Sequence, residues 1–216
     1  MSLEPTPPEL GPLDRQNVVA LDAPRPSPAR RILTEAIQTI ALALLLFLVI
    51  NSLSARIRVD GSSMQPSFQD GDYVIVNKLA YRSNDLQRGD VVVFPFPMNR
   101  EEDFIKRVIA LPGDRLEIMD GDVYLNGVLL TEPYLLTEAR GDMDEIIVPP
   151  GHVFVMGDNR NDSSDSRVWG PLNITEIIGK AVFRYWPFNE MGTVEHPVIF
   201  DASGFDRLLD RALAAR

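Results

Sequence analysis

The sequence contains no cysteine, and histidine is scarce. Without cysteine there is no thiol nucleophile and no thiolate metal site. Only His152 and His196 are present, so a histidine-rich metal centre is disfavoured and a Ser-His-Asp triad would depend on one of these two residues. We therefore expect neither a metal nor another cofactor.

A basic surface is lacking as well. The 31 Asp and Glu residues outnumber the 21 Lys and Arg residues, which gives a formal net charge of −10. Phosphate binding requires a basic face, so we expect no nucleic-acid partner. An acidic balance is also what keeps many soluble domains in solution. No repeat of fixed period occurs, and 216 residues suffice for one core, or for one core with a small lobe.

The N-terminal residues 1–31 have few large apolar side chains and are rich in proline. Such a segment cannot bury enough surface to offset the conformational entropy of an ordered chain. We expect residues 1–31 to be a disordered tail. Its prolines are Pro5, Pro7, Pro8, Pro12, Pro24, Pro26 and Pro28.

One long apolar run follows this tail. No charged residue occurs from Ala36 to Ala55, and residues 40–50 are apolar throughout. Twenty helical residues span about 30 Å, the thickness of the hydrocarbon core of a bilayer. We expect a transmembrane anchor over residues 32–55. A buried soluble helix and a secretory signal cleaved near residues 52–55 are the alternatives, but the long proline-rich tail and the length of the run favour a retained anchor.

The charges beside this run give a weak indication of its orientation. Arg25, Arg30 and Arg31 precede the run, whereas Arg56 and Arg58 follow it. Because cytoplasmic flanks carry more basic residues, the difference favours a cytoplasmic N-terminus. We expect a single-pass protein of the plasma membrane with an extracytoplasmic domain over residues 56–200.

Residues 56–200 have the pattern of short β-strands. The expected strands are rich in Val and Ile and are separated by Gly, Pro and Asp turns, which predicts a mainly β, antiparallel and barrel-like domain. Asn126-Gly127 is the strongest hairpin signal, because a type I′ turn needs positive φ at both positions. A short helical patch is expected at residues 174–178 and a C-terminal helical tail at residues 201–216. The strands are expected at residues 57–60, 73–77, 91–96, 104–110, 115–119, 123–125, 128–130, 145–148, 153–156 and 180–186.

Ser63 and Lys106 form the candidate catalytic pair. Ser63 lies in a tight turn, residues 61–66, shortly after the apolar run and so close to the expected bilayer surface. Lys106 shares one face of its strand with Phe104 and Val108, because alternate residues of a strand lie on the same side. A lysine accepts a proton near pH 7 only if its pKa falls by roughly three units, about 4 kcal/mol, and desolvation can lower it. The alternatives are a simple turn serine and a lysine whose amine reaches water at the strand edge.

Short polar side chains dominate a third segment, residues 156–170. The segment could be a solvated turn. It does not fit a calcium loop, because the glycine and the closing glutamate of an EF-hand are absent from the required positions.

Four segments together resemble the ordered motifs of bacterial type I signal peptidase. The resemblance extends from the apolar run to about Pro187. It implies a serine endopeptidase with a Ser/Lys dyad, which releases exported proteins from membrane-held signal peptides. It also implies an antiparallel β domain shared with self-cleaving repressors of the LexA type, here with an N-terminal transmembrane helix. The segments are residues 61–67 (GSSMQPS), 88–94 (RGDVVVF), 104–114 (FIKRVIALPGD) and 157–167 (GDNRNDSSDSR).

The resemblance assigns roles position by position. Ser63 resembles the nucleophile, Lys106 the general base, and Ser163 the serine that orients the lysine amine. Asp165 and Arg167 match an ion pair that holds the loop of the site. The backbone N–H of Ser63 would be one oxyanion donor.

Two departures from the family pattern affect these roles. Gly61 stands where some members have a serine that assists the oxyanion, so the second donor is left to a backbone group or water. The order Asn161-Asp162 is the reverse of a pair common in the family, and we assign neither residue a role.

The expected substrate is the signal peptide of an exported preprotein, presented at a lipid bilayer. We expect it to bind as an added β-strand, with small residues at the cleaved bond and two residues before it. By resemblance, shallow apolar pockets for these residues are lined by Val59, Met64, Val93, Phe104 and Ile105. Acyl transfer to Ser63 would then be followed by hydrolysis.

Three other functions fit the sequence less well. A penicillin-recognising enzyme needs a lysine three residues after its serine, a spacing that does not occur here. A self-cleaving repressor would need a DNA-binding helical domain. A catalytically inactive peptide-binding domain would have lost the serine or the lysine, and both are present.

Overall fold

The structure, a computed structural model, describes residues 28–81, 86–137 and 139–197. The expected C-terminal helical tail, residues 201–216, lies outside these ranges, as do residues 1–27 of the expected tail. Residues 28–31, which we expected to belong to the tail, are the first turn of a helix.

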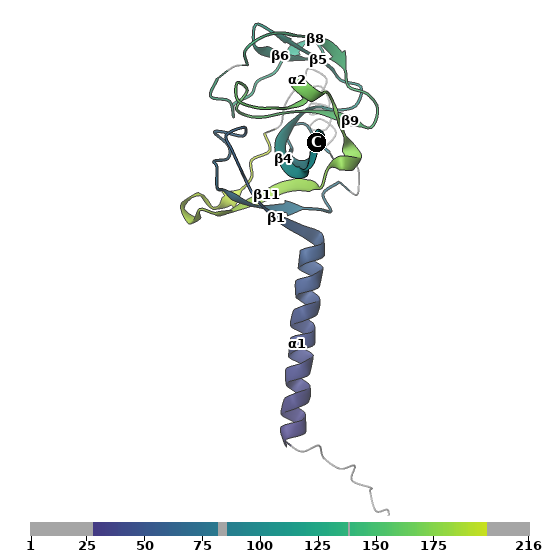
Figure 1. Cartoon of the computed structure of the whole chain (residues 1–216), viewed down its shortest axis with the longest axis vertical. Coiled ribbons are helices and arrows are strands. Elements are labelled where there is room, and N and C mark those ends of the chain that lie inside the picture. Colours follow the sequence, from purple (N-terminus) through teal and green to yellow (C-terminus); the bar gives the residue numbers. More distant parts are fainter. Residues whose placement is uncertain (1–27, 82–85, 138, 198–216) are drawn as a thin grey trace, which may run out of the picture. The chain divides into compact units, whose positions relative to one another are not determined.

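The apolar run forms a single helix, α1, over Pro28–Leu53 (Figure 1). None of its side chains is buried, although most of them are apolar. Within the described residues it is the one helix long and apolar enough to cross a membrane. It ends two residues before the expected boundary at Ala55, because Ser54 and Ala55 already pair with strand β2.

The remainder of the described chain is mainly antiparallel β-structure, as predicted. The larger sheet has the strand order β1-β2-β11-β3-β4-β9-β10, with β12 paired to β11. These strands are β1 (Ser54–Arg58), β2 (Tyr73–Asn77), β3 (Val91–Phe96), β4 (Asn99–Ala110), β9 (His152–Met156), β10 (Leu172–Asn173), β11 (Gly179–Trp186) and β12 (Gly192–Thr193).

A second, smaller sheet lies apart from the first in Figure 1, where β5, β6 and β8 are grouped together. Its strand order is β7-β6-β5-β8. The strands are β5 (Arg115–Met119), β6 (Asp122–Leu125), β7 (Val128–Leu129) and β8 (Met143–Ile147). Three short helices complete the described part: α2 (Ser166–Trp169) and the 3₁₀ turns η1 (Ile174–Glu176) and η2 (Phe188–Glu190).

The predicted hairpin turn at Asn126-Gly127 is confirmed. Both residues have positive φ, 54° and 80°, as a type I′ turn requires, and the turn joins the paired strands β6 and β7. The strands predicted at 73–77, 91–96 and 115–119 have the predicted bounds.

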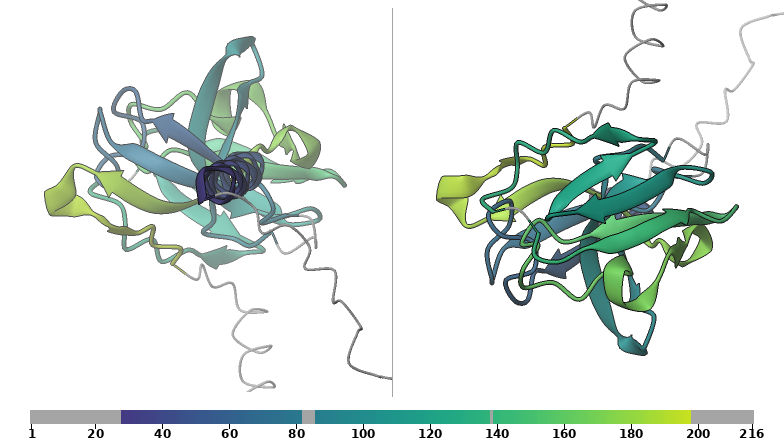
Figure 2. Two further views of the ribbon diagram at one scale, coloured as in Figure 1. Left: turned by 90° about the horizontal axis from the view of Figure 1, so that it is seen from below. Right: turned by 90° about the horizontal axis from the view of Figure 1, so that it is seen from above.

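Strand β4 differs most from the prediction. It begins at Asn99, five residues before the expected start, because residues 99–103 pair with the end of β3. These five residues are polar or charged and exposed, so they carry no apolar alternation that would mark a strand. The resulting β3–β4 hairpin extends from the rest of the β domain in both views of Figure 2. This longer strand forms one wall of the site described below.

The inner half of β4 is buried on both faces, because Ile109 packs in one hydrophobic cluster and Val108, on the other face, packs in another. Lys106 is 3% exposed and its neighbour Arg107 is 1% exposed. The Arg107 guanidinium makes two hydrogen bonds to Asp158, at 2.8 and 2.6 Å, and others to the carbonyls of Gly89 and Glu195 and to Ser67. The buried charge is tolerated here because each nitrogen of the guanidinium donates to a hydrogen-bond partner.

This ion pair leads to a prediction about stability. Asp158→Ala leaves the Arg107 charge buried without its carboxylate, so we expect the free energy of unfolding to fall by about 3–5 kcal/mol. Denaturant unfolding of the full chain in detergent measures the change. Asp158→Asn, which keeps the shape and one acceptor, should lose less. A loss below about 1 kcal/mol for Asp158→Ala would mean that solvent reaches Arg107.

Candidate active site

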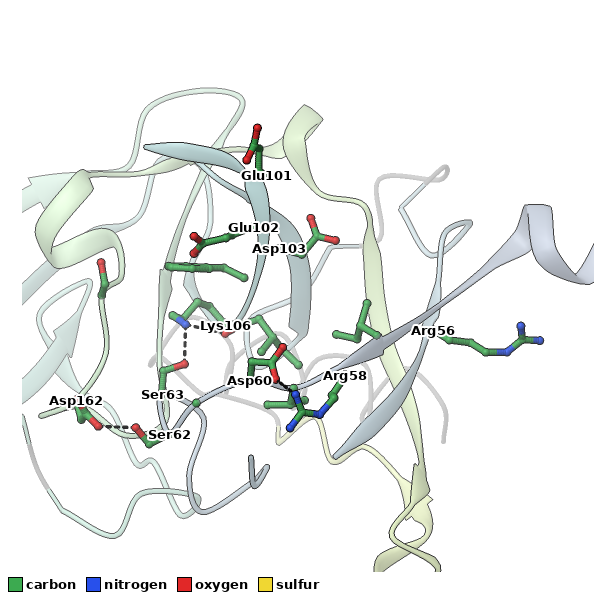
Figure 3. Close-up of a pocket in the computed structure, with 16 residues that line it drawn as sticks. Arg56, Arg58, Asp60, Ser62, Ser63, Glu101, Glu102, Asp103, Lys106 and Asp162 are labelled. Atoms are coloured by element: carbon green, nitrogen blue, oxygen red, sulfur yellow. Dashed lines mark hydrogen bonds and ion pairs between the residues drawn. The ribbon is translucent and has the colours of Figure 1, made fainter. Parts of the chain in front are cut away.

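Ser63 and Lys106 are in direct contact although they are 43 residues apart in sequence. Ser63 lies in the turn that follows β1, and Lys106 lies in β4. The Lys106 Nζ donates a hydrogen bond to Ser63 Oγ at 2.8 Å and another to the carbonyl of Ile105 at 2.9 Å (Figure 3). A neutral amine at the same position can instead accept the Ser63 proton. The two groups therefore meet the geometric requirement for a nucleophile and its base.

Burial makes the lysine a weaker base than an exposed one. Desolvation lowers the pKa of Lys106 from 10.5 to about 8, and the negative charges of Asp165 and Asp158 limit the decrease. The Phe104 ring, 4.8 Å from Nζ, forms part of the apolar surroundings, as the strand alternation predicted. A substantial fraction of the amine is therefore neutral at mildly alkaline pH.

An open groove of about 710 Å³ runs past the Ser63–Lys106 pair. Its walls come from two places: β1 and the turn after it, and the outer half of β4. Of the five residues predicted to form the substrate pockets, Val59, Phe104 and Ile105 line this groove. Met64 and Val93 do not. Both are fully buried in the core cluster that also contains Val59 and Ile105, so they support the wall and are not exposed to the groove.

The rim of the groove is strongly charged, which the sequence did not predict. Figure 3 shows acidic side chains on β4 opposite arginines of β1. Arg58 pairs with Asp60. The charged residues that line the groove, besides Lys106, are Arg56, Arg58, Asp60, Glu101, Glu102, Asp103 and Asp162.

The polar segment predicted to support the site folds against residues 61–66, the turn that contains the candidate nucleophile Ser63 and is called the nucleophile turn from here on. Asp165 and Arg167 form the expected ion pair, with Nη2 2.7 Å from Oδ2 and Nε 2.8 Å from Oδ1. The same carboxylate is fully buried, accepts from the backbone N–H of Gly157 at 3.0 Å and caps helix α2. Asp165 therefore joins the two ends of this segment.

No hydrogen bond joins Ser163 to the lysine amine within the described residues, so the expected role of Ser163 stays a prediction. Its Oγ is buried and makes no hydrogen bond within the described residues, whereas Lys106 Nζ bonds to Ser63 and to the carbonyl of Ile105. The Ser163 hydroxyl instead lies close to the backbone of Gly157. If residue 157 had a Cβ atom, that atom would be 2.3 Å from Ser163 Oγ.

Comparison with known proteins is consistent with this geometry. The family model described as signal peptidase, peptidase S26, matches residues 33–186, a range that includes Ser63, Lys106 and all of residues 157–167. The chain belongs to this family. As a member of the signal peptidase family it is a serine-type peptidase, and hence a hydrolase.

Several individual proteins are similar to the chain. The signal peptidase I of Bacillus caldolyticus is 44% identical over 146 residues, which cover 61% of this chain and 79% of the relative. A probable signal peptidase I-1 of Synechocystis sp. is 41% identical over 179 residues, 79% of this chain and 91% of the relative. A crystal structure of a signal peptidase I from Enterococcus faecalis is 34% identical in sequence to this chain, and the two structures superpose with a TM-score of 0.42. The match covers 45% of this chain and 97% of the Enterococcus chain.

Two residues that contact the nucleophile turn were not predicted. Asn159 donates to the carbonyls of both Ser62 and Ser63, and Asp162 accepts from the Ser62 hydroxyl at 2.5 Å. Only their place in the polar segment 156–170 could have drawn attention to them. Local sequence does not reveal that this segment packs on a turn almost a hundred residues earlier.

Gly157 permits this close packing, which gives a second prediction. A Cβ at this position would lie 2.4 Å from the carbonyl oxygen of Ser63 and 2.3 Å from Ser163 Oγ. In the signal peptidase fold, Gly157→Ala should therefore displace the nucleophile turn, lowering kcat/KM by at least about tenfold and the free energy of unfolding by about 1–3 kcal/mol. Peptide cleavage and thermal melting measure the two effects. Gly192→Ala is the matched control, because no atom of the described residues lies within 4 Å of its Cβ position; equal behaviour of the two variants would contradict the prediction.

Proposed function

We propose that this signal peptidase family member is a membrane-anchored endopeptidase that removes N-terminal signal peptides from exported preproteins with a Ser63–Lys106 dyad. The observation that carries the proposal is the 2.8 Å contact between Lys106 Nζ and Ser63 Oγ at the wall of the groove. Family membership supports the substrate class. Depression of the lysine pKa to about 8 supports its role as the base.

The acylation step uses both residues. Ser63 Oγ attacks the carbonyl carbon of the scissile bond while its proton moves to the neutral Lys106 Nζ. The tetrahedral intermediate then collapses, the C–N bond breaks, and the lysine returns the proton to the leaving amine. The product chain leaves with a free amino terminus, and the signal peptide remains as an ester on Ser63.

Hydrolysis of this ester restores the enzyme. Lys106, again neutral, takes a proton from a water molecule that attacks the ester carbonyl, and Ser63 recovers its proton as the bond breaks. Both steps place negative charge on the carbonyl oxygen. The backbone N–H of Ser63 makes no hydrogen bond within the described residues, so it is available to stabilise that charge.

Two free strand edges border the groove and suit a peptide in extended conformation. Among the described residues, strand β1 pairs only with β2, and β4 pairs with β9 only from Arg107 onward. The outer half of β4 thus has no β partner, among the described residues, on the side away from β3. A substrate strand can hydrogen-bond to such edges by β-augmentation, which fixes the scissile bond relative to Ser63. Val59, Phe104 and Ile105 would then form shallow apolar pockets for small side chains.

The remaining predicted residues have supporting roles in this proposal. The Asp165–Arg167 ion pair holds the segment that packs on the nucleophile turn. Ser163 orients the lysine amine during turnover; its buried hydroxyl makes no hydrogen bond within the described residues and is free to do so.

The anchor places the reaction at a membrane. Helix α1 has the length and composition to span a bilayer. We propose that it crosses the plasma membrane once, with the N-terminus in the cytoplasm and residues 56–200 outside, where exported chains emerge.

A processing assay tests the proposed function. The full chain in detergent or vesicles should cleave a preprotein whose signal peptide has alanine at the residue before the cleaved bond and two residues earlier. The same preprotein with leucine at both positions is the control and should remain uncut, because shallow pockets exclude it. Equal cleavage of the two, or cleavage of neither, would refute the proposal.

A further inference from the structure

Asn159 binds the backbone carbonyl before Ser63 and the carbonyl of Ser63 itself. Its side-chain Nδ2 donates to the carbonyl of Ser62 at 3.2 Å, and its backbone N–H donates to the carbonyl of Ser63 at 3.0 Å. The Ser62 carbonyl also accepts from the N–H of Gln65 at 3.0 Å. One asparagine therefore contacts the two carbonyl groups that flank the reactive residue.

These contacts determine where the Ser63 N–H points. The Ser62–Ser63 peptide bond is not among the cis bonds of the chain, so its C=O and N–H point in opposite directions. With the Ser62 oxygen drawn toward Asn159 and Gln65, the Ser63 N–H is directed to the opposite side. It makes no hydrogen bond within the described residues, and Ser63 itself lines the groove.

Asn159 is itself rigidly held by its two neighbours. Asp158 is paired with buried Arg107, with Nη2 2.6 Å from Oδ2. Arg160 pairs with Glu132, and its Nε donates to the Gly157 carbonyl at 3.1 Å. Both ion pairs are almost fully buried, so Asn159 lies between two fixed points.

Asp162 adds a second contact to the same turn. Its Oδ2 accepts from the Ser62 hydroxyl at 2.5 Å, as Figure 3 shows beside Ser63. The turn is thus bound to the polar segment through the side chain and the carbonyl of Ser62 and through the carbonyl of Ser63.

We propose that Asn159 is a positioning residue that aims the Ser63 N–H at the carbonyl oxygen of the scissile bond. The inference rests on the proposed acyl-transfer function and adds a residue to it. An amide dipole stabilises an oxyanion only if its direction is fixed before the charge develops. The Asn159 side chain supplies that fixation without touching the substrate.

The test replaces Asn159 in the full-length enzyme and separates catalysis from binding. Asn159→Ala should lower kcat for a signal-bearing peptide roughly 10- to 100-fold while KM changes less than about twofold, since the oxyanion forms only after binding. Affinity for a peptide aldehyde, which forms a tetrahedral adduct with Ser63, should fall by the same factor as kcat. The pH at which kcat/KM is half its maximum should not move, because Lys106 is unaffected.

Asn159→Asp is the second variant, because it keeps the size of the side chain but presents an oxygen to the Ser62 carbonyl. It should lose at least as much activity as Asn159→Ala. Asn173→Ala is the matched control: Asn173 caps η1 through its side chain and, among the described residues, makes no hydrogen bond to the nucleophile turn.

Each other outcome contradicts the inference. An Asn159→Ala enzyme within twofold of Asn173→Ala in kcat would overturn it. So would a rise in KM alone, a shift of the pH profile, or unfolding of both Asn159 variants below the assay temperature, since these indicate roles in binding, in the base or in stability. The Ser63→Ala variant distinguishes failure of the proposed function from failure of the Asn159 inference. If Ser63→Ala still cleaves, the proposed function fails. If Ser63→Ala is inactive while Asn159→Ala is fully active, only the role of Asn159 is refuted.

Discussion

Ser63→Ala is expected to lower kcat/KM for a signal-bearing preprotein by at least about 10⁴-fold, because no acyl-enzyme can form without the hydroxyl oxygen. Lys106 then keeps its hydrogen bond to the carbonyl of Ile105, and the fold should persist, since Ser63 belongs to a turn and not to the core. Single-turnover cleavage of the preprotein measures the loss, and thermal melting checks the fold.

Ser54→Ala provides a matched serine deletion for this experiment. The Ser54 hydroxyl donates to the carbonyl of Ile50, and Ser54 is not among the residues that line the groove in the described chain. The Ser54→Ala variant should retain full activity. If Ser63→Ala kept even a tenth of the wild-type rate, another group would have to be the nucleophile.

Removal of the Lys106 amine should have the second largest effect. Lys106→Met keeps an unbranched apolar stem in the buried position but has no group that accepts a proton, so we expect a loss of about 10²–10⁴-fold in kcat/KM. Lys106→Arg should not restore activity, because guanidinium stays protonated at any working pH. Lys78→Met, at an exposed site, is the control and should cleave normally.

The pH dependence of the wild-type enzyme tests the same role. Below the lysine pKa the amine is protonated and cannot accept the Ser63 proton; above it the neutral base predominates. Because burial lowers this pKa to about 8, kcat/KM should rise with pH and level off above that value. A profile that is flat across this range, or that falls as pH rises through it, would exclude Lys106 as the base.

Lys106 and Arg107 illustrate two ways of burying a cation in adjacent residues of one strand. Arg107 keeps its charge, because Asp158, two carbonyls and Ser67 surround the guanidinium. Within the part of the chain that the structure describes, Lys106 has only Ser63 and the Ile105 carbonyl as hydrogen-bond partners, with Phe104 over the amine. Burial without a paired carboxylate favours the neutral form, which is the form that a general base requires.

The local features of this protein follow from short stretches of its sequence. An uncharged apolar run of twenty residues predicted a helix that can span a bilayer, and Asn126-Gly127 predicted a hairpin turn, because both depend only on neighbouring residues. The four ordered motifs were sufficient to suggest the family, and with it Ser63 and Lys106.

The contacts between distant residues became known from the folded chain alone. Strand pairing extended β4 through five polar residues that have no strand pattern, and so made the second wall of the groove. It placed Met64 and Val93 in the core and left the Ser163 hydroxyl without a hydrogen bond in the described part of the chain. It also brought Asn159 and Asp162 to the nucleophile turn. The physical reason is that contacts between residues 43 or 100 positions apart follow from strand register and loop packing, which local propensity does not encode.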